Sequence, residues 1–219
     1  MSRPRAILFD FDGTLIDSAP SILAGLGRAL AREGVQPVVP LSASLIGPPL
    51  PRTLATLAGS AEPALIERLA AAYREDYDST GFRQTAVYAG VEDMLQWLGG
   101  AGIILHIVTN KRIRPTRLIL DHLGWQRHFH GVYALDALQP AAADKTALVR
   151  EVLQRESLPA GSTWMVGDSA DDQRAAQGNA LRFLAAGWGY GLGADDAAAE
   201  RLPSPAALLR HLQQVAAQV

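Results

Sequence analysis

Short apolar runs alternate along most of the chain with segments in which apolar residues recur every three or four positions. The short runs have the length and the polar boundaries of buried strands, and the periodic segments are typical of helices that pack on a core. We expect strands at residues 6–9, 103–108, 132–134, 163–166 and 181–186, and helices at 91–98, 114–123, 144–156 and in the segment that ends at Gly178. This alternation predicts parallel βαβ units, and therefore an α/β fold with a doubly wound parallel sheet that is covered on both faces.

The segment that follows the first expected strand has only helical spacing. It predicts helices from about residue 19 to Gly34, from Arg52 to Leu57 and from Pro63 to about Tyr77. No strand is expected between residue 17 and about residue 82. We therefore expect two domains: an α/β core formed by residues 1–16 and 84–219, and a small all-helical cap domain, residues 17–83, inserted after the first strand.

Composition and charge exclude several classes of protein. With 219 residues, of which 48% are hydrophobic, the chain can hold one large domain or one domain with an insert. The chain has no cysteine, which excludes disulfides, zinc–thiolate sites and thiol nucleophiles. The net charge of -2 provides no broad basic field, so we expect neither nucleic acid nor a membrane as a partner. The N-terminal apolar run is too short for a secretory signal, and no run approaches the roughly 18 residues that span a bilayer, so we expect a cytoplasmic protein.

Polar residues follow three of the expected strands. The first strand leads into Asp10-Phe11-Asp12-Gly13-Thr14, the second into Thr109-Asn110-Lys111, and a later one into Gly167-Asp168-Ser169, with Asp171 and Asp172 just beyond. Lys145 opens the helix that precedes this later strand. Ligands of open α/β sheets bind beyond the carboxyl ends of the strands, so these side chains are expected to meet at one site.

The residue types at these strand ends predict phosphoryl chemistry with a metal. Clustered carboxylates repel one another, so a cation is expected among them. Oxygen ligands in a chain without cysteine favour Mg²⁺ over a transition metal. Carboxylates, a lysine and a threonine at one site suit a phosphoryl group, because Mg²⁺ and the lysine cancel its charge while an aspartate attacks phosphorus.

The motifs resemble those of the haloacid dehalogenase superfamily. Asp10-Phe11-Asp12-Gly13-Thr14-Leu15 looks like its first motif, and Thr109, Lys145 and the segment from Gly167 to Asp172 stand where the second, third and fourth motifs belong. The helical insert, together with Ile46-Gly47-Pro48-Pro49-Leu50 and Trp188-Gly189-Tyr190-Gly191, resembles the phosphoglycolate-phosphatase-like subgroup. The chain departs from that subgroup at the third motif, where Thr146 rather than a proline follows the lysine.

The resemblance implies a role for each matching residue. Asp10 would attack phosphorus and form an aspartyl-phosphate. Asp12 would protonate the leaving oxygen and later activate the hydrolytic water, and its backbone carbonyl would help to hold Mg²⁺. Thr109 and the amide of Asn110 would bind phosphoryl oxygens. Lys145 would neutralise charge on the nucleophile and on the phosphate.

The resemblance also implies a set of Mg²⁺ ligands, which would be Asp10, Asp12, Asp168 and Asp172. Asp172 would support the metal directly or through an intervening group. Its neighbour Asp171 is the alternative, because adjacent side chains cannot both face one site, and the motif spacing favours Asp172. Lys111 is likewise the alternative to the lysine of the third motif and would otherwise be a solvated neighbour of the site.

The implied function is that of a Mg²⁺-dependent phosphatase acting on a small phosphorylated metabolite, with phosphoglycolate as the first candidate. Asp12 argues against dehalogenation, because a departing halide needs no proton. A phosphoglucomutase-like phosphoryl transferase or a pyrophosphatase would use the same core motifs, so these alternatives stay open. A non-catalytic binding protein is a further alternative, but it would not need all of the residues of the four motifs, which are Asp10, Asp12, Thr109, Lys145 and Asp168. The sequence leaves monomer and dimer equally open.

Four other features have a structural interpretation beside a functional one. His128 and His130 are more typical of a polar loop edge than of metal ligands, and His106 is more typical of a satisfied core residue. Residues 189–194 match the G-x-G-x-x-A dinucleotide pattern, but they open no βαβ unit and are better explained as a tight loop near the site. Arg52 stands at a helix start, where a substrate contact and a surface position are equally expected.

Overall fold

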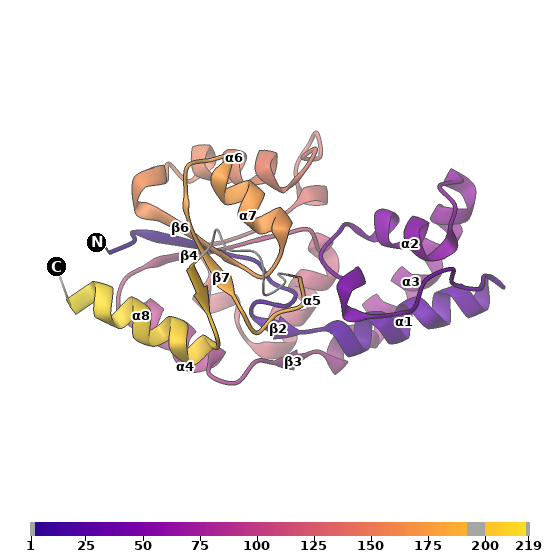
Figure 1. Cartoon of the computed structure of the whole chain (residues 1–219), viewed down its shortest axis with the longest axis horizontal. Helices are drawn as coiled ribbons and strands as arrows, with labels where there is room; N and C mark the ends of the chain where they lie inside the picture. Colours follow the sequence, from indigo (N-terminus) through magenta and orange to yellow (C-terminus); the bar gives the residue numbers. More distant parts are fainter. Residues whose placement is uncertain (1–2, 192–199, 218–219) are drawn as a thin grey trace.

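The computed structural model of the chain describes residues 3–191 and 200–217 (Figure 1). Six parallel strands form its main sheet in the order β5-β4-β1-β6-β7-β8. They are β1 (Ala6–Phe9), β4 (Ile104–Thr109), β5 (Gly131–Ala134), β6 (Thr163–Gly167), β7 (Arg182–Ala186) and β8 (Glu200–Leu202). The chain runs outward from β1 to β5, returns to the other side of β1 and runs outward again to β8. The expected doubly wound parallel sheet is therefore confirmed.

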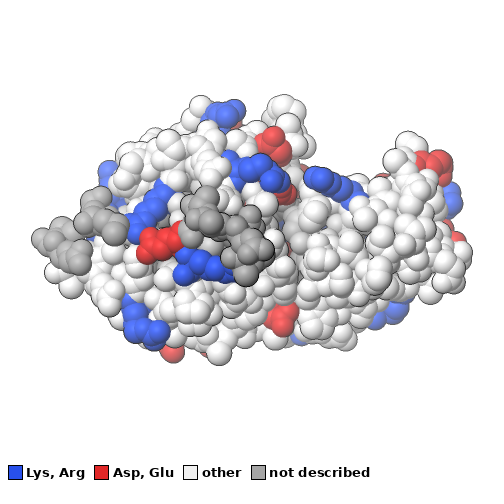
Figure 2. Space-filling view, viewed as in Figure 1, with Lys and Arg blue, Asp and Glu red and all other residues white. Residues whose placement is uncertain are grey.

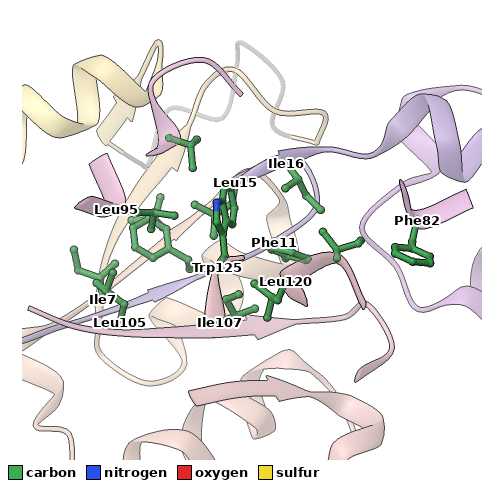
Figure 3. Close-up of a cluster of buried hydrophobic side chains, with 14 of the residues drawn as sticks. Ile7, Phe11, Leu15, Ile16, Phe82, Leu95, Leu105, Ile107, Leu120 and Trp125 are labelled. Atoms are coloured by element: carbon green, nitrogen blue, oxygen red, sulfur yellow. The ribbon is translucent and has the colours of Figure 1, made fainter. Parts of the chain in front are cut away.

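The central strand β1 is buried on both faces. All four of its residues are fully buried, and β4 and β6 flank it on either side. Ile7 and Phe9 belong to the apolar cluster on one face of the sheet, whereas Ala6 and Leu8 belong to the cluster on the other. This division follows from the two-residue period of a strand. Figure 3 shows part of the first cluster, with Ile7 close to the side chain of Leu105.

Helices cover both faces of the sheet. The first cluster includes residues of α4 (Val91–Gly100), α5 (Ile113–Leu123) and α8 (Pro205–Ala217), and the second includes residues of α6 (Lys145–Arg155) and α7 (Ala170–Gln177). In Figure 1, α6 and α7 lie above the sheet and α4 and α8 lie below it. The sheet thus forms the middle of three layers, and the helices leave the carboxyl ends of its strands free to form a site.

Three further helices lie together at one end of the sheet (Figure 1). They are α1 (Ala19–Arg32), α2 (Leu50–Ala58) and α3 (Pro63–Ser79), and α3 packs against both of the others. Leu26, Leu54 and Leu69, one from each helix, are fully buried. These are the three helices expected after the first strand. The division into a core of residues 1–16 and 84–219 and a cap of residues 17–83 stays a prediction.

Short elements connect the longer ones, and some of them were not expected. β2 (Ile16–Asp17) pairs antiparallel with β3 (Ala86–Val87), although no strand was expected at residue 17. A strand of two residues has no periodicity that a sequence pattern can reveal. β8 and α8, both beyond residue 186, were also missed, and α4 ends at Gly100, two residues beyond the expected range of 91–98. The 3₁₀ helices are Ala43–Leu45, Gly81–Gln84, Gln126–His128, Leu135–Ala137 and Ala160–Ser162.

Surface charge and helix length bear on the expected partners. On the face shown in Figure 2, basic and acidic side chains are interspersed. Within residues 3–191 and 200–217, no helix is both long and apolar enough to cross a membrane. The expected lack of a nucleic-acid partner stays a prediction.

Candidate active site

The first motif leaves β1 in a tight turn that brings it against the end of β6. The amides of Leu15 and Ile16 both donate to the carbonyl of Phe11, and Gly13 has φ +82°, which a side chain disfavours. A Cβ atom at Gly13 would lie 2.4 Å from Oδ2 of Asp168. Glycine at this position therefore lets the first and fourth motifs approach one another.

Three carboxylates meet where these motifs come together. Asp10 follows β1, Asp168 follows β6, and Asp172 lies in the first turn of α7. All three are buried, and their ligand oxygens lie within 4.8 Å of one another. Asp172 is oriented by a capping box, in which the amide of Ser169 donates to its Oδ2 at 3.0 Å. The structure therefore brings these three residues together, as the sequence predicts.

Asp171 and Asp172 point in different directions. Asp171 pairs with Arg174 on its own helix and accepts from Nδ2 of Asn110 at 3.2 Å. Asp172 instead contacts Lys145, with 2.5 Å between Oδ1 and Nζ. Asp171 is therefore outside the carboxylate cluster, and the preference for Asp172 agrees with the geometry.

Lys145 is the cation of this cluster. It is the first residue of α6, whose N-cap Asp144 accepts from the amide of Ala147, and it is only 4% exposed. Its Nζ lies 2.6 Å from Oδ1 of Asp10 as well as 2.5 Å from Asp172. Burial alone would lower the pKa of Lys145, but these two carboxylates outweigh burial and raise it. The lysine is therefore charged and held between Asp10 and Asp172.

One ammonium is not enough for three buried carboxylates. Burial raises the pKa of Asp10 well above its usual value, and repulsion from Asp172 adds to the effect, with Lys145 opposing it. Burial and the same repulsion raise the pKa of Asp168 to about 6. A divalent cation among the three would supply the missing positive charge. The donor set, which consists of carboxylate oxygens only, fits Mg²⁺.

Without added metal, the variant Asp168→Asn is expected to become more stable relative to the wild type as the pH rises. The pKa of Asp168 is about 6 in the folded chain and 3.8 in a model compound, so the folded state holds the proton more tightly. The stability that this group contributes is present below about pH 4 and is lost as the pH rises through about 6. Urea unfolding with a chelator, at about pH 4 and about pH 7, measures the difference between the two proteins.

The control for this experiment is Asp93→Asn, which changes an exposed residue of α4 and should gain no stability with pH. Mg²⁺ at neutral pH should stabilise the wild type more than Asp168→Asn. If the stability difference between Asp168→Asn and the wild type were the same at the two pH values, the pKa of Asp168 would not be raised by folding.

Asp12 faces a different set of partners. Its Oδ1 accepts from the hydroxyl of Ser18 at 2.5 Å, and both of its oxygens accept from Nζ of Lys111, at 3.1 and 3.2 Å. The side chain of Lys111 is 6% exposed and also donates to the hydroxyl of Tyr77 at 3.1 Å. Lys111 is thus buried, and the view of it as a solvated neighbour is wrong. Each of the first-motif aspartates has its own lysine.

Thr109 and Asn110 end β4 on the same side of the sheet. The Oγ1 of Thr109 accepts from the amide of Lys111 at 3.1 Å, and the residue is 1% exposed. The side chain of Asn110 donates to the carbonyl of Gly47 at 2.9 Å and to Asp171. Asn110 therefore joins the core to the segment that precedes α2.

The loop after β7 contacts the site through Tyr190, which the sequence pattern did not single out. The amide of Tyr190 donates to Oδ2 of Asp168 at 2.7 Å, and its hydroxyl donates to Asp17 at 2.7 Å and accepts from the amide of Ser18 at 2.9 Å. A Cβ atom at Gly189 would lie 2.2 Å from Cβ of Asp168. The expected tight loop is present at Gly189 and Gly191, whereas residues 192–194 of the glycine pattern lie outside the described residues. In the sequence, the Trp-Gly-Tyr-Gly motif of residues 188–191 is the feature that could have pointed to this loop.

Within the part of the chain that the structure describes, the carboxylate cluster includes no histidine, and Arg52 lines a neighbouring cavity. His106 is fully buried, as expected. Neither of its ring nitrogens has a hydrogen-bond partner within the described residues, so the expectation that its hydrogen bonds are satisfied was wrong. Burial lowers the pKa of His106. His130 accepts from the amide of Leu105 at 3.3 Å and is exposed, as a loop-edge residue would be. Arg52 is exposed and lines a cavity that also includes Lys145 and Arg174.

A second cavity, with a largely apolar lining, opens beside the two first-motif aspartates. Its volume is about 610 Å³ when the space open to solvent is included, and its mainly apolar lining with a few polar groups is typical of a small-molecule site. Asp10, Asp12 and Thr109 line it from the core side, and side chains of α1, α2 and α3 line it from the other. Asp10, Asp12 and Thr109 thus face a partly open cavity between the sheet and the three helices.

Comparison with known proteins identifies the family. The family model described as haloacid dehalogenase-like hydrolase matches residues 7–186. The tyrosine-protein kinase PtkA of Mycobacterium tuberculosis is 32% identical over 191 residues, which make up 86% of this chain and 64% of the kinase, so the chain spans less than two thirds of that relative. A phosphoglycolate phosphatase of Xanthomonas campestris pv. campestris is 35% identical over 198 residues, covering 90% of this chain and 89% of the relative.

A solved structure supports the same relationship. The crystal structure of a predicted phosphatase from Clostridium acetobutylicum matches with a TM-score of 0.86 at 25% identity, over 97% of this chain and 100% of the other. The family match includes the first motif, the two lysines and the carboxylate pair of the fourth motif. The chain therefore belongs to the haloacid dehalogenase-like hydrolase family.

Proposed function

We propose that this chain is a Mg²⁺-dependent phosphatase that hydrolyses phosphate monoesters of small metabolites through an aspartyl-phosphate on Asp10. The observation that carries the proposal is the convergence of Asp10, Asp168 and Asp172 with Lys145. Asp10 and Asp12 also line the cavity in which an ester could bind. Positive groups around a nucleophilic carboxylate are what attack on a phosphate dianion requires.

The carboxylates of Asp10 and Asp168 would hold the metal, together with the backbone carbonyl of Asp12. Asp172 would join them directly or through a water molecule. Bound Mg²⁺ would neutralise charge on the phosphoryl oxygens. Tyr190 and Thr14 orient Asp168, because its Oδ2 accepts from the amide of Tyr190 and its Oδ1 from the hydroxyl of Thr14.

In the first step, a carboxylate oxygen of Asp10 attacks phosphorus and the ester P–O bond breaks. Asp12 gives its proton to the departing oxygen. In the second step, Asp12 takes a proton from a water molecule, which attacks the phosphorus of the aspartyl-phosphate and releases inorganic phosphate and free Asp10. Lys145 binds one oxygen of Asp10 throughout, and Ser18 and Lys111 hold Asp12 in place. Thr109, with the amide of Asn110, is proposed to bind phosphoryl oxygens.

The helices α1 to α3 would act as a cap that keeps bulk water from the reacting groups, with residues 17–83 as its limits. The resemblance to phosphoglycolate phosphatases makes phosphoglycolate the first metabolite to assay. A phosphoglucomutase-like transferase or a pyrophosphatase would form the same aspartyl-phosphate and differ only in the acceptor. We expect a cytoplasmic enzyme, and both monomer and dimer are compatible with this mechanism.

Incubating the purified chain with 4-nitrophenyl phosphate tests the proposal. We expect release of nitrophenolate with Mg²⁺ and almost none with a chelator, because the carboxylate cluster lacks a balancing charge without the metal. Phosphate release measured in parallel shows that water is the acceptor. Metal-independent hydrolysis, or none under either condition, would count against the proposal.

A further inference from the structure

Resting on the proposed phosphatase function, we infer that the esters this chain hydrolyses best have an uncharged, largely apolar leaving group. A phosphoryl group at Asp10 places the rest of the ester in the cavity between Asp12 and the helices α1 and α3. The charges and the apolar side chains that line this cavity decide which leaving groups it accepts.

Both cations that line the cavity are already paired with carboxylates. Nζ of Lys111 lies 3.1 Å from Oδ1 of Asp12 and also bonds to Tyr77. The guanidinium of Arg112 donates to both oxygens of Asp78 on α3, at 3.0 and 2.6 Å. Turning either cation toward a ligand would break an existing ion pair. For Lys111, it would also remove a contact that holds the proposed proton donor.

The two aspartates of the cavity lining, Asp10 and Asp12, bring no positive charge to the place where an anionic leaving group would lie. The other cations near the site are placed elsewhere. Lys145 contacts Asp10 and Asp172, and Arg52 lines a different cavity, together with Arg174. A carboxylate or second phosphate on the leaving group would therefore be desolvated without a cation of its own, which is strongly unfavourable.

Most of the remaining lining is apolar or aromatic. Ile22 of α1, Leu45 and Leu50 are half-buried, so part of their surface is available to a ligand. Tyr73 and Tyr77 of α3 stack with ring centroids 5.2 Å apart and planes 13° from parallel. Contact with such a surface favours alkyl or aryl groups, because it removes their apolar area from water. The charges and the apolar lining of the cavity thus both favour an uncharged, apolar leaving group.

Two matched pairs of esters test the inference on the purified full chain with Mg²⁺. Benzyl phosphate is compared with 4-carboxybenzyl phosphate, and 2-hydroxyethyl phosphate with phosphoglycolate, so that each pair differs by a carboxylate. We expect kcat/KM to be higher for the uncharged member of each pair by about tenfold or more, the ratio that corresponds to about 1.4 kcal/mol. Benzyl phosphate is expected to be the best of the four.

The variant Asp78→Asn tests the charge argument itself. It removes the carboxylate that holds Arg112, so the arginine can bind an anionic leaving group, and the ratio within each pair should shrink by about threefold or more. Asp76→Asn is the matched control. Asp76 lies on the same helix and accepts two bonds from Arg28, at 2.9 and 2.7 Å, but neither residue lines the cavity. Its ratios should equal those of the wild type.

The outcomes separate the inference from the proposed function. Metal-dependent hydrolysis with equal or higher kcat/KM for the carboxylated esters overturns the inference and leaves the proposed function standing. An unchanged ratio in a folded Asp78→Asn protein also overturns it. Hydrolysis of none of the four esters overturns the proposed function. If Asp78→Asn does not fold, the two wild-type ratios decide the matter alone.

Discussion

Replacing Asp10 with asparagine is expected to lower kcat by about 10³-fold or more while leaving the fold intact. An amide oxygen is a poor nucleophile, so no aspartyl-phosphate can form. Asparagine has nearly the same shape, and its carbonyl can still accept from Nζ of Lys145, which lies 2.6 Å from Oδ1. Steady-state phosphate release measures kcat, and circular dichroism with thermal unfolding checks the fold.

The control for Asp10→Asn is Asp171→Asn. Asp171 is also an aspartate near the site, but it pairs with Arg174 and lies outside the carboxylate cluster. Its kcat should stay close to that of the wild type. If Asp10→Asn kept a near-normal kcat, covalent catalysis by this residue would be refuted. If Asp171→Asn lost activity as severely, the assignment within the fourth motif would need to be revised.

Replacing Lys145 with methionine is expected to destabilise the metal-free protein by about 3–5 kcal/mol at neutral pH and to abolish turnover. Lys145 is 4% exposed and is the ammonium that contacts both Asp10 and Asp172. Without it, Asp10 and Asp172 lose their counter-charge, and the pKa of Asp10 is already raised by burial and by repulsion from Asp172. Urea unfolding at about pH 7 and about pH 5 measures the free energy, and the loss should be smaller at the lower pH because protonation removes the repulsion.

Arg150→Met on the same helix serves as the control, because Arg150 is exposed and its replacement should change the free energy of unfolding by less than about 0.5 kcal/mol. Mg²⁺ should restore part of the stability that Lys145→Met loses, because the cation binds the same carboxylates. A Lys145→Met protein as stable as the wild type at both pH values would show that the ammonium does not balance these carboxylates.

The fold was largely predictable because its main strands are buried on both faces. A buried parallel strand is apolar along most of its length, so β1, β4 and β6 stand out as mainly apolar runs between polar residues. β8 does not have this signature, because its residues Glu200, Arg201 and Leu202 lie at the sheet edge and are partly or fully exposed. β2 and β3 pair over two residues each, too few for any pattern.

The residues that meet at the site were also predictable, because the carboxyl ends of parallel strands share one edge of the sheet. Asp10, Asp168 and Lys145 were chosen on this ground, and the structure brings them together. The partner of Lys111 was not predictable, because the lysine follows Asn110 in the chain and nothing local shows that its side chain turns toward Asp12. The contact of Tyr190 with Asp168 spans 22 positions, so the Trp-Gly-Tyr-Gly segment marks the loop but does not show which residue it contacts.

By itself, the sequence determined the α/β class, the strand ends that carry chemistry and the family, because these depend on local patterns of apolar and acidic residues. Only the tertiary structure decided how the charges are paired: Lys145 with Asp10 and Asp172, Lys111 with Asp12, and Arg112 with Asp78. Pairing depends on distances of a few ångströms between segments far apart in the chain, and electrostatic energies change steeply over such distances. The charge that a substrate can carry into the cavity therefore follows from the folded arrangement and not from the order of the residues.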